Sequence, residues 1–151
     1  MRASEYKFLP TEEEEQTMLF AWVSMQKHTY PELGLLFHVP NEGKRTAQTG
    51  ARLKAAGLSS GVPDICLPVA KCGYNALYIE LKRQKGGTLS ANQKLWLEKL
   101  LRAGNLAVRC NGFEEAKNVL IKYIKGEIHG PSTFGKSKIS EKGCRKVQTA
   151  D

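Results

Sequence analysis

The sequence predicts one small α/β domain in which a central mixed sheet is flanked by helices. Two apolar stretches of strand length, residues 61–67 and 78–84, are separated by the turn-forming segment 70–75, which is typical of adjacent strands. Helical patterns that open with capping sequences lie on both sides of this strand pair. The complete order is helix, strand, helix, strand, strand, helix, strand, helix, which is typical of an α/β sandwich.

The first helix is predicted to begin at Thr11, because residues 11–14 form a capping box in which a threonine is followed three residues later by a glutamate. The acidic first turn also complements the helix dipole. The buried stripe is expected to run to about Lys27 through Leu19, Trp22, Val23 and Met25 or Gln26. Continued backwards by three and four residues, this stripe places Gln16, Glu15 and Glu12 on the inward side of the helix.

The segment that follows the first helix is expected to contain one strand and one helix. Residues 35–39 form an apolar run that ends in a turn at residues 40–43. A second helix, residues 44–56, would close at Gly57, since glycine commonly follows the last helical residue. His38 lies in the predicted strand, where a histidine is more often a packed or edge residue than a general base.

The C-terminal part of the domain continues the alternation of helix and strand. A second capping box, residues 90–93, opens a helix that is expected to stop at Gly104. The apolar positions of this helix are Leu95, Trp96, Leu97, Leu100 and Leu101. Residues 106–110 are predicted as the last strand and residues 113–123 as the last helix. Its inward side would be formed by Phe113, Ala116, Val119, Leu120, Tyr123 and Ile124.

Three charged residues of the central strand pair form a candidate hydrolytic site. Because side chains alternate between the two faces of a strand, Tyr78, Glu80 and Lys82 share one face. Asp64 is a lone carboxylate in an apolar stretch, where an unpaired charge would be costly to bury. A divalent cation shared by Asp64 and Glu80 would supply the partner, since Mg²⁺ prefers oxygen ligands. Lys82 could orient or help deprotonate an attacking water and offset the charge of the transition state.

The order of these residues resembles the PD-(D/E)xK nuclease motif, with Pro63-Asp64 followed after fifteen residues by Glu80-x-Lys82. Longer strings are similar to those of the VRR-NUC branch of that superfamily: Gly61-Val62-Pro63-Asp64, Tyr78-Ile79-Glu80-Leu81-Lys82 and Leu89-Ser90-Ala91-Asn92-Gln93-Lys94. The resemblance covers about residues 12–125. It implies a restriction-endonuclease-like core and metal-dependent hydrolysis of DNA, with Mg²⁺ or Mn²⁺ as the cofactor.

The resemblance also nominates further site residues. In related nucleases a glutamate of the first helix joins the metal site, which together with the helical phase nominates Glu12 or Glu15. Gln93 has two interpretations, because it is the third residue of a capping box and also matches the glutamine that lies beside the family's metal site. The candidate catalytic residues are therefore Asp64, Glu80, Lys82, Gln93, Glu15 and Glu12, with Asp64 and Glu80 as metal ligands.

The charge of the chain favours a polyanionic partner. Its 151 residues carry a formal net charge of +8, from 23 Lys plus Arg against 15 Asp plus Glu. Candidate nucleic-acid contacts are Lys44, Arg45, Arg52, Arg83 and Lys85, although a merely solvated basic surface is an alternative. Residues 1–10 are expected to lead loosely into a domain of residues 11–125. The basic segment 126–151 is predicted to be a mobile tail that either adds salt-sensitive affinity for nucleic acid or only aids solubility.

The composition disfavours several classes of protein. The chain is 41% hydrophobic and 25% charged, as is usual for a globular protein. It has no apolar run of membrane-spanning length and no apolar stretch typical of a signal peptide, so a cytoplasmic protein of a bacterium or a phage-infected cell is expected. The four cysteines include no C-x₂-C pair and are interpreted as reduced thiols rather than as a zinc site.

The resulting hypothesis is a metal-dependent endonuclease. By analogy with stand-alone bacterial or phage members of the family, it would act as a homodimer on branched DNA such as Holliday junctions, with two symmetry-related sites. Two alternatives remain open, a monomeric flap or nicking nuclease and a non-catalytic basic module that binds nucleic acid. The pair of carboxylates argues against the binding module, because phosphate binding alone would favour replacing groups that repel the backbone.

Overall fold

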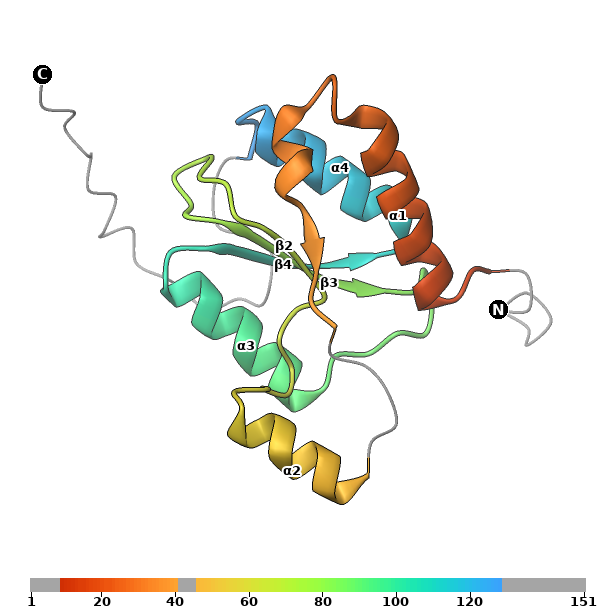
Figure 1. The fold of residues 1–151 in the computed structure, drawn as a ribbon. Coiled ribbons are helices and arrows are strands. Elements are labelled where there is room, and N and C mark those ends of the chain that lie inside the picture. Colours follow the sequence, from red (N-terminus) through yellow and green to blue (C-terminus); the bar gives the residue numbers. More distant parts are fainter. Residues whose placement is uncertain (1–8, 41–45, 129–151) are drawn as a thin grey trace, which may run out of the picture.

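A four-stranded mixed sheet forms the centre of the protein, with helices on both faces (Figure 1). The computed structural model describes residues 9–40 and 46–128. The elements are, in order, α1 (Glu12–Gln26), the 3₁₀ helix η2 (Pro31–Leu35), β1 (Phe37–His38), α2 (Ala47–Ala55), β2 (Ile65–Leu67), β3 (Leu77–Lys82), α3 (Ala91–Arg102), β4 (Leu106–Asn111) and α4 (Phe113–Ile124). Apart from the added 3₁₀ helix, this is the predicted order, and the prediction of an α/β fold is confirmed.

The sheet has the strand order β1-β2-β3-β4. β1 pairs with β2 and β2 pairs with β3 in antiparallel fashion, whereas β3 and β4 are parallel and are connected through α3. The connection between β2 and β3 turns at Cys72 and Gly73, whose φ angles are 55° and 79°. Two successive positive φ angles are typical of the type I′ turns that join antiparallel strands. The two central strands are therefore adjacent, as the sequence predicts.

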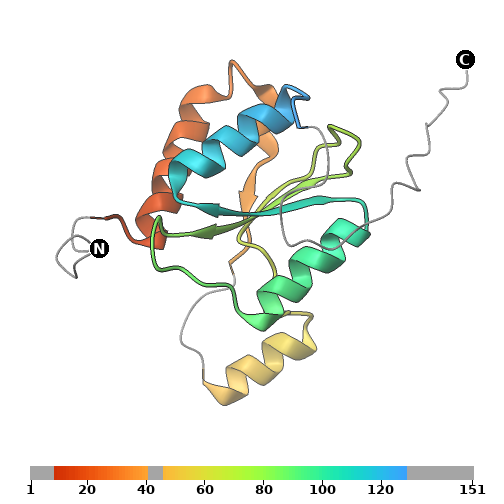
Figure 2. The ribbon, with the colours of Figure 1, turned by 180° about the vertical axis from the view of Figure 1, so that it is seen from behind.

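The hydrophobic core lies between the sheet and the helices α1 and α4. Figures 1 and 2 show these two helices on one side of the sheet, with α3 on the other side and α2 beyond α3. Buried core residues from the strands and from these two helices include Ile65, Leu67, Leu77, Ile79, Leu81, Leu19, Val23, Leu120 and Tyr123. The alternation of β3 turns its leucine and isoleucine side chains into this core, so that Glu80 and Lys82 project from the other face.

Some expected details are corrected by the structure. The predicted strand 35–39 is limited to Phe37–His38, because Pro31 begins a 3₁₀ helix that buries Leu33 and extends through Leu35. Met25 is 69% exposed and lies outside the buried side of α1. Likewise, α3 buries Leu97, whereas Leu95 is exposed.

The second helix begins later than predicted. Thr46 is extended, and its hydroxyl accepts a hydrogen bond from the backbone N–H of Thr49, so that α2 starts at Ala47. Gly57 follows the helix with a φ of 102°, as expected for a glycine that ends a helix. The predicted turn at residues 40–43 lies mostly outside the described residues, as do almost the whole predicted tail and Cys144. In the described part of the chain, Cys66, Cys72 and Cys110 are free thiols, and no helix has the length and apolar character needed to cross a membrane.

Candidate active site

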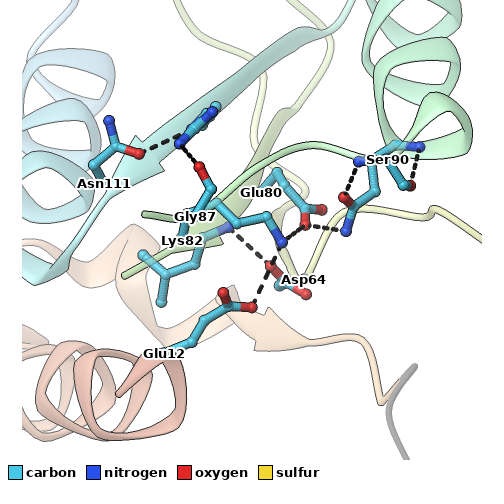
Figure 3. A network of polar contacts seen from close by, with 10 residues as sticks. Glu12, Asp64, Glu80, Lys82, Gly87, Ser90 and Asn111 are labelled. Atoms are coloured by element: carbon cyan, nitrogen blue, oxygen red, sulfur yellow. Dashed lines mark hydrogen bonds and ion pairs between the residues drawn. The ribbon is translucent and has the colours of Figure 1, made fainter. Parts of the chain in front are cut away.

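Asp64, Glu80 and Lys82 lie together where β3 ends near the N-terminus of α1 (Figure 3). Their residue exposures are only 6%, 1% and 7%. Lys82 Nζ is 2.8 Å from Glu80 Oε1, and the backbone N–H of Leu81 donates to Asp64 Oδ2 at 2.8 Å. Charged side chains are rarely buried unless they are paired or bind a ligand. The structure thus brings together the three residues that the nuclease motif predicts.

The backbone of Asp64 is held by the neighbouring edge strand. Its carbonyl oxygen accepts a hydrogen bond from the N–H of Val39 at 2.7 Å and lies 3.0 Å from Nδ1 of His38. These contacts fix the start of β2, from which the Asp64 carboxylate reaches the backbone of β3. His38 accordingly has the role of a packed edge-strand residue rather than of a base beside the carboxylates.

The first helix contributes Glu12 to this group of residues. Glu12 Oε1 lies 3.6 Å from Lys82 Nζ, so that the ammonium group contacts two carboxylates. Glu15 is directed elsewhere, because its carboxylate accepts hydrogen bonds from Gln84 Nε2 and from the backbone N–H of Phe113. Of the two nominated glutamates, the structure brings only Glu12 to the motif residues. We use the name carboxylate–lysine site for Glu12, Asp64, Glu80 and Lys82.

Gln93 makes two contacts, one with the cap of α3 and one with Glu80. Its side-chain Oε1 accepts the backbone N–H of Ser90 at 2.8 Å, which completes the capping box of α3. Its Nε2 donates to Glu80 Oε1 at 2.6 Å. Because the cap fixes the amide group, α3 presents a rigid donor to the carboxylate of Glu80 (Figure 3).

The electrostatics of Glu80 are dominated by its burial. Burial raises the pKa of this carboxyl group to about 7, although the hydrogen bond from Lys82 lowers it, while the charge of Asp64 raises it further. Burial alone would lower the pKa of Lys82. The pKa is nevertheless raised, chiefly by the hydrogen bond with Glu80 and by the negative charge of Glu80. The second oxygen, Glu80 Oε2, is buried and accepts no hydrogen bond from any described residue.

This unsatisfied oxygen fits a cation, because a buried carboxylate oxygen without a donor is energetically costly. Among the described residues, no group of three or more His, Cys, Asp or Glu side chains is placed to hold a metal ion. Asp64 and Glu80 can therefore supply only part of a coordination shell. A small shell of carboxylates suits Mg²⁺, which usually keeps several waters or takes oxygens from a substrate phosphate.

Residues outside the predicted set also support the site. Arg109 pairs with Glu80 in the register of β3 and β4, and its guanidinium donates to Gly87 O at 2.6 Å and to Asn111 Oδ1 at 2.8 Å. The loop after β3 is thereby folded back, so that a Cβ on Gly87 would lie 2.9 Å from Lys82 Cβ. In the sequence, the indication of such a role is that Arg109 is a charged residue within the otherwise apolar stretch 106–110.

Three of the candidate nucleic-acid contacts lie on the described surface of the protein. Arg83 and Lys85 are exposed in the turn that directly follows β3, and Arg52 is exposed in the last turn of α2. Lys44 and Arg45 lie outside the described residues. Thus the predicted basic residues nearest in sequence to Lys82 are exposed on the surface.

Comparison with known proteins agrees with this geometry. The model of the VRR-NUC domain matches residues 10–114. A solved structure described as a "VRR_NUC domain protein" is 30% identical in sequence and superposes with a TM-score of 0.68, over 78% of this chain and 90% of the other. A search of curated proteins gave no match. The fold is therefore restriction-endonuclease-like, and the chain belongs to the VRR-NUC family of nuclease-type domains.

Proposed function

We propose that this protein is a metal-dependent endonuclease that hydrolyses phosphodiester bonds of DNA. The observation that carries the proposal is the buried pair Asp64 and Glu80, with Glu80 Oε2 lacking a hydrogen-bond donor among the described residues. Lys82 is one ammonium group among the three carboxylates of the site, so burying Asp64 and Glu80 together is unfavourable unless a further cation compensates the remaining charge. A protein that only bound the phosphate backbone would have no use for such a pair.

Asp64 and Glu80 would hold Mg²⁺ or Mn²⁺, with Glu12 nearby on α1. When bound, the ion would polarise the phosphate and lower the pKa of a coordinated water. Gln93 keeps one oxygen of Glu80 oriented through its hydrogen bond. The N–H of Leu81 does the same for Asp64. The protein therefore holds both carboxylates in place before the ion binds, which reduces the cost of organising the site.

Lys82 provides the positive charge of the site. Its ammonium is held between Glu80 and Glu12, at 2.8 and 3.6 Å. From this position it can orient the attacking water and offset the negative charge that develops on the phosphate. Its raised pKa keeps it protonated at neutral pH, so orientation and charge compensation are favoured over proton abstraction as its role.

We further propose branched DNA, including Holliday junctions, as the substrate and a homodimer as the active form. The resemblance to stand-alone VRR-NUC proteins and the net charge of +8 support this choice. A monomeric flap or nicking nuclease is the second candidate. Light scattering of the purified protein would separate these alternatives, since only the dimer places two identical sites on one junction.

Cleavage of labelled four-way junction, flap and linear duplex DNA tests the proposed function. The wild-type protein should cut with Mg²⁺ or Mn²⁺ and not with EDTA, while Asp64→Asn and Lys82→Ala should each lose at least a hundredfold in rate. Lys122→Ala serves as a matched control, because Lys122 is exposed on α4. Binding of DNA without cleavage under every metal condition would contradict the proposal and favour a non-catalytic binding module.

A further inference from the structure

A third buried carboxylate, that of Glu15, lies beside the carboxylate–lysine site and has its own hydrogen-bond donors. Glu15 is 0% exposed. The backbone N–H of Phe113 donates to its Oε2 at 2.6 Å, and Gln84 Nε2 donates to its Oε1 at 2.8 Å. Phe113 is the first residue of α4, so the carboxylate also lies at the positive end of that helix. Both oxygens are satisfied by the protein, which distinguishes Glu15 from Glu80.

The start of α4 is built to receive this carboxylate. Gly112 occupies the N-cap position and therefore offers no side-chain cap. A Cβ at this position would lie 2.7 Å from Gln84 Cγ and 3.2 and 3.3 Å from the two oxygens of Glu15, and the φ of Gly112 is 85°. An N-cap is usually Ser, Thr, Asp or Asn, whose own oxygen accepts an N–H of the first turn. Here a residue of another helix, Glu15, replaces that side chain.

The same contacts connect α4 and α1 to the end of β3. The N–H of Gly112 donates to the carbonyl oxygen of Lys82 at 2.7 Å, and Gln84 follows Lys82 by two residues in the chain. Glu12 precedes Glu15 by three residues on α1, and residues at this spacing share one side of a helix. Fixing Glu15 therefore fixes the position of the Glu12 backbone relative to Lys82.

We propose that Glu15 is a positioning residue that caps α4 from α1 and thereby holds Glu12 beside Lys82. The capping box of Thr11 and Glu14 consists of contacts within α1 and its N-cap, so it does not attach the helix to the rest of the protein. The buried residues Leu19 and Val23 lie one and two turns beyond Glu15. Glu15 is the buried contact closest to Glu12 within α1. Its effect on catalysis rests on the nuclease function proposed above, whereas its capping contact does not.

Amide hydrogen exchange at Phe113 tests the capping contact independently of any activity. Glu15→Ala should lower the protection of this amide at least tenfold, because its acceptor is removed. Glu15→Gln, which keeps an oxygen acceptor of the same reach, should retain most of the protection, and Glu13→Ala, on the exposed side of the same turn, should leave it unchanged. Equal protection of Phe113 in the wild type and Glu15→Ala would overturn the proposal.

A double-mutant cycle with Glu12 tests the positioning effect. Glu15→Ala should lower kcat about 10- to 100-fold with little change in KM for DNA, as expected when a catalytic group is displaced by about 1 Å. In a Glu12→Gln background, the same change should cost less than about twofold, because the group that it positions is already inactive. Losses that multiply in the double variant would overturn the proposal.

Gln84→Ala provides a second route if Glu15→Ala does not fold, since Gln84 is exposed and its loss removes only one of the two donors. A smaller fall in kcat, about three- to tenfold and again absent in the Glu12→Gln background, is expected. An unchanged kcat in Gln84→Ala together with a full loss of activity in Glu15→Gln would contradict a positioning role.

If the wild-type protein cleaves no DNA, the proposed nuclease function fails, while the exchange result at Phe113 still decides the capping contact.

Discussion

Glu80 is the residue whose environment most directly determines the properties of the site. One of its oxygens contacts both Lys82 and Gln93, whereas the other is buried and has no donor among the described residues. Burial raises the pKa of the carboxyl group to about 7, so that without a cation it takes up a proton near neutral pH. A divalent cation would compete with that proton for the same carboxylate.

The raised pKa of Glu80 predicts that the metal-free protein loses stability as the pH rises. The pKa of about 7 in the folded protein lies above the ordinary glutamate value of 4.5, so the folded state binds the proton more tightly than the unfolded chain. This stabilisation is complete below about pH 4.5 and falls by about 3 kcal/mol in total as the pH rises through 7. Urea unfolding in EDTA between pH 5 and 8 measures this effect. Glu80→Gln, which does not titrate, should lack that component of the slope; identical pH profiles for both proteins would contradict the assignment.

At the scale of the elements, the first turn of α3 is the support on which the site is built. Gln93 caps this turn and contacts Glu80, while Asn92 Nδ2 donates to Ser60 Oγ in the loop that leads to Asp64. A Cβ on Gly61 would lie 2.6 Å from the carbonyl carbon of Asn92. The N-terminus of α3 therefore contacts both the loop that leads to Asp64 and the strand that carries Glu80.

The two functions of Gln93 can be separated by comparing variants of the capping box. Ser90→Ala removes only a cap and should cost about 1 kcal/mol of stability with cleavage retained. Gln93→Ala removes the cap contact and the donor to Glu80, so its cleavage rate should fall about tenfold further than that of Ser90→Ala. Urea unfolding combined with single-turnover cleavage measures both quantities. Equal cleavage rates for the two variants would show that the contact with Glu80 has no catalytic importance.

The close contact at Gly61 predicts an unusual sensitivity of this loop. Gly61→Ala combines a φ of 89° with a contact below 3 Å to the backbone and should cost about 2–4 kcal/mol. Gly57→Ala is the matched control, because Gly57 has a φ of 102° but nothing within 4 Å of its added Cβ, and it should cost only about 1 kcal/mol. Thermal unfolding of the two variants tests the difference. A cost at Gly61 no larger than that at Gly57 would refute the close packing against Asn92.

The elements with strong local signals were predictable from the sequence. Capping boxes identified the starts of α1 and α3, and the alternation of β3 placed Glu80 and Lys82 on one face. Contacts between distant segments were not predictable in this way. Helical phase left Glu12 and Glu15 equivalent, because only the approach of Gly112 and Gln84 in three dimensions gives Glu15 a different environment. Similarly, nothing local to Arg109 indicates that it reaches the carbonyl of Gly87.

At the scale of the whole molecule, the distribution of charge supports binding of a polyanion. The net charge is +8, although the site itself contains three carboxylates and one ammonium group. Attraction of DNA must therefore come from the surface around the site rather than from its centre. Arg83 and Lys85 are exposed in the turn after β3 and are the candidates closest to Lys82 in the chain.

Contacts of Arg83 and Lys85 with phosphates predict a change in the salt dependence of DNA binding. The double variant Arg83→Ala/Lys85→Ala should bind more weakly at low salt and lower the slope of log K against log salt by about 2. Lys122→Ala should leave the slope unchanged. Fluorescence anisotropy with labelled junction DNA over a range of salt concentrations, in Ca²⁺ to limit cleavage, gives the slopes. A slope equal to that of the wild type would exclude these residues as phosphate contacts.

Calorimetric titration of Mn²⁺ into the wild-type protein and into Glu80→Gln at pH 7.5 tests whether Asp64 and Glu80 hold a metal ion. We expect one saturable binding event in the wild type that is lost or weakened at least tenfold in Glu80→Gln. Binding to the wild type should be weaker at pH 6, because the proton competes for Glu80. Equal affinities for Mn²⁺ in both proteins, or no binding even in the presence of an uncleavable DNA junction, would contradict the assignment of the buried carboxylate pair as a metal site.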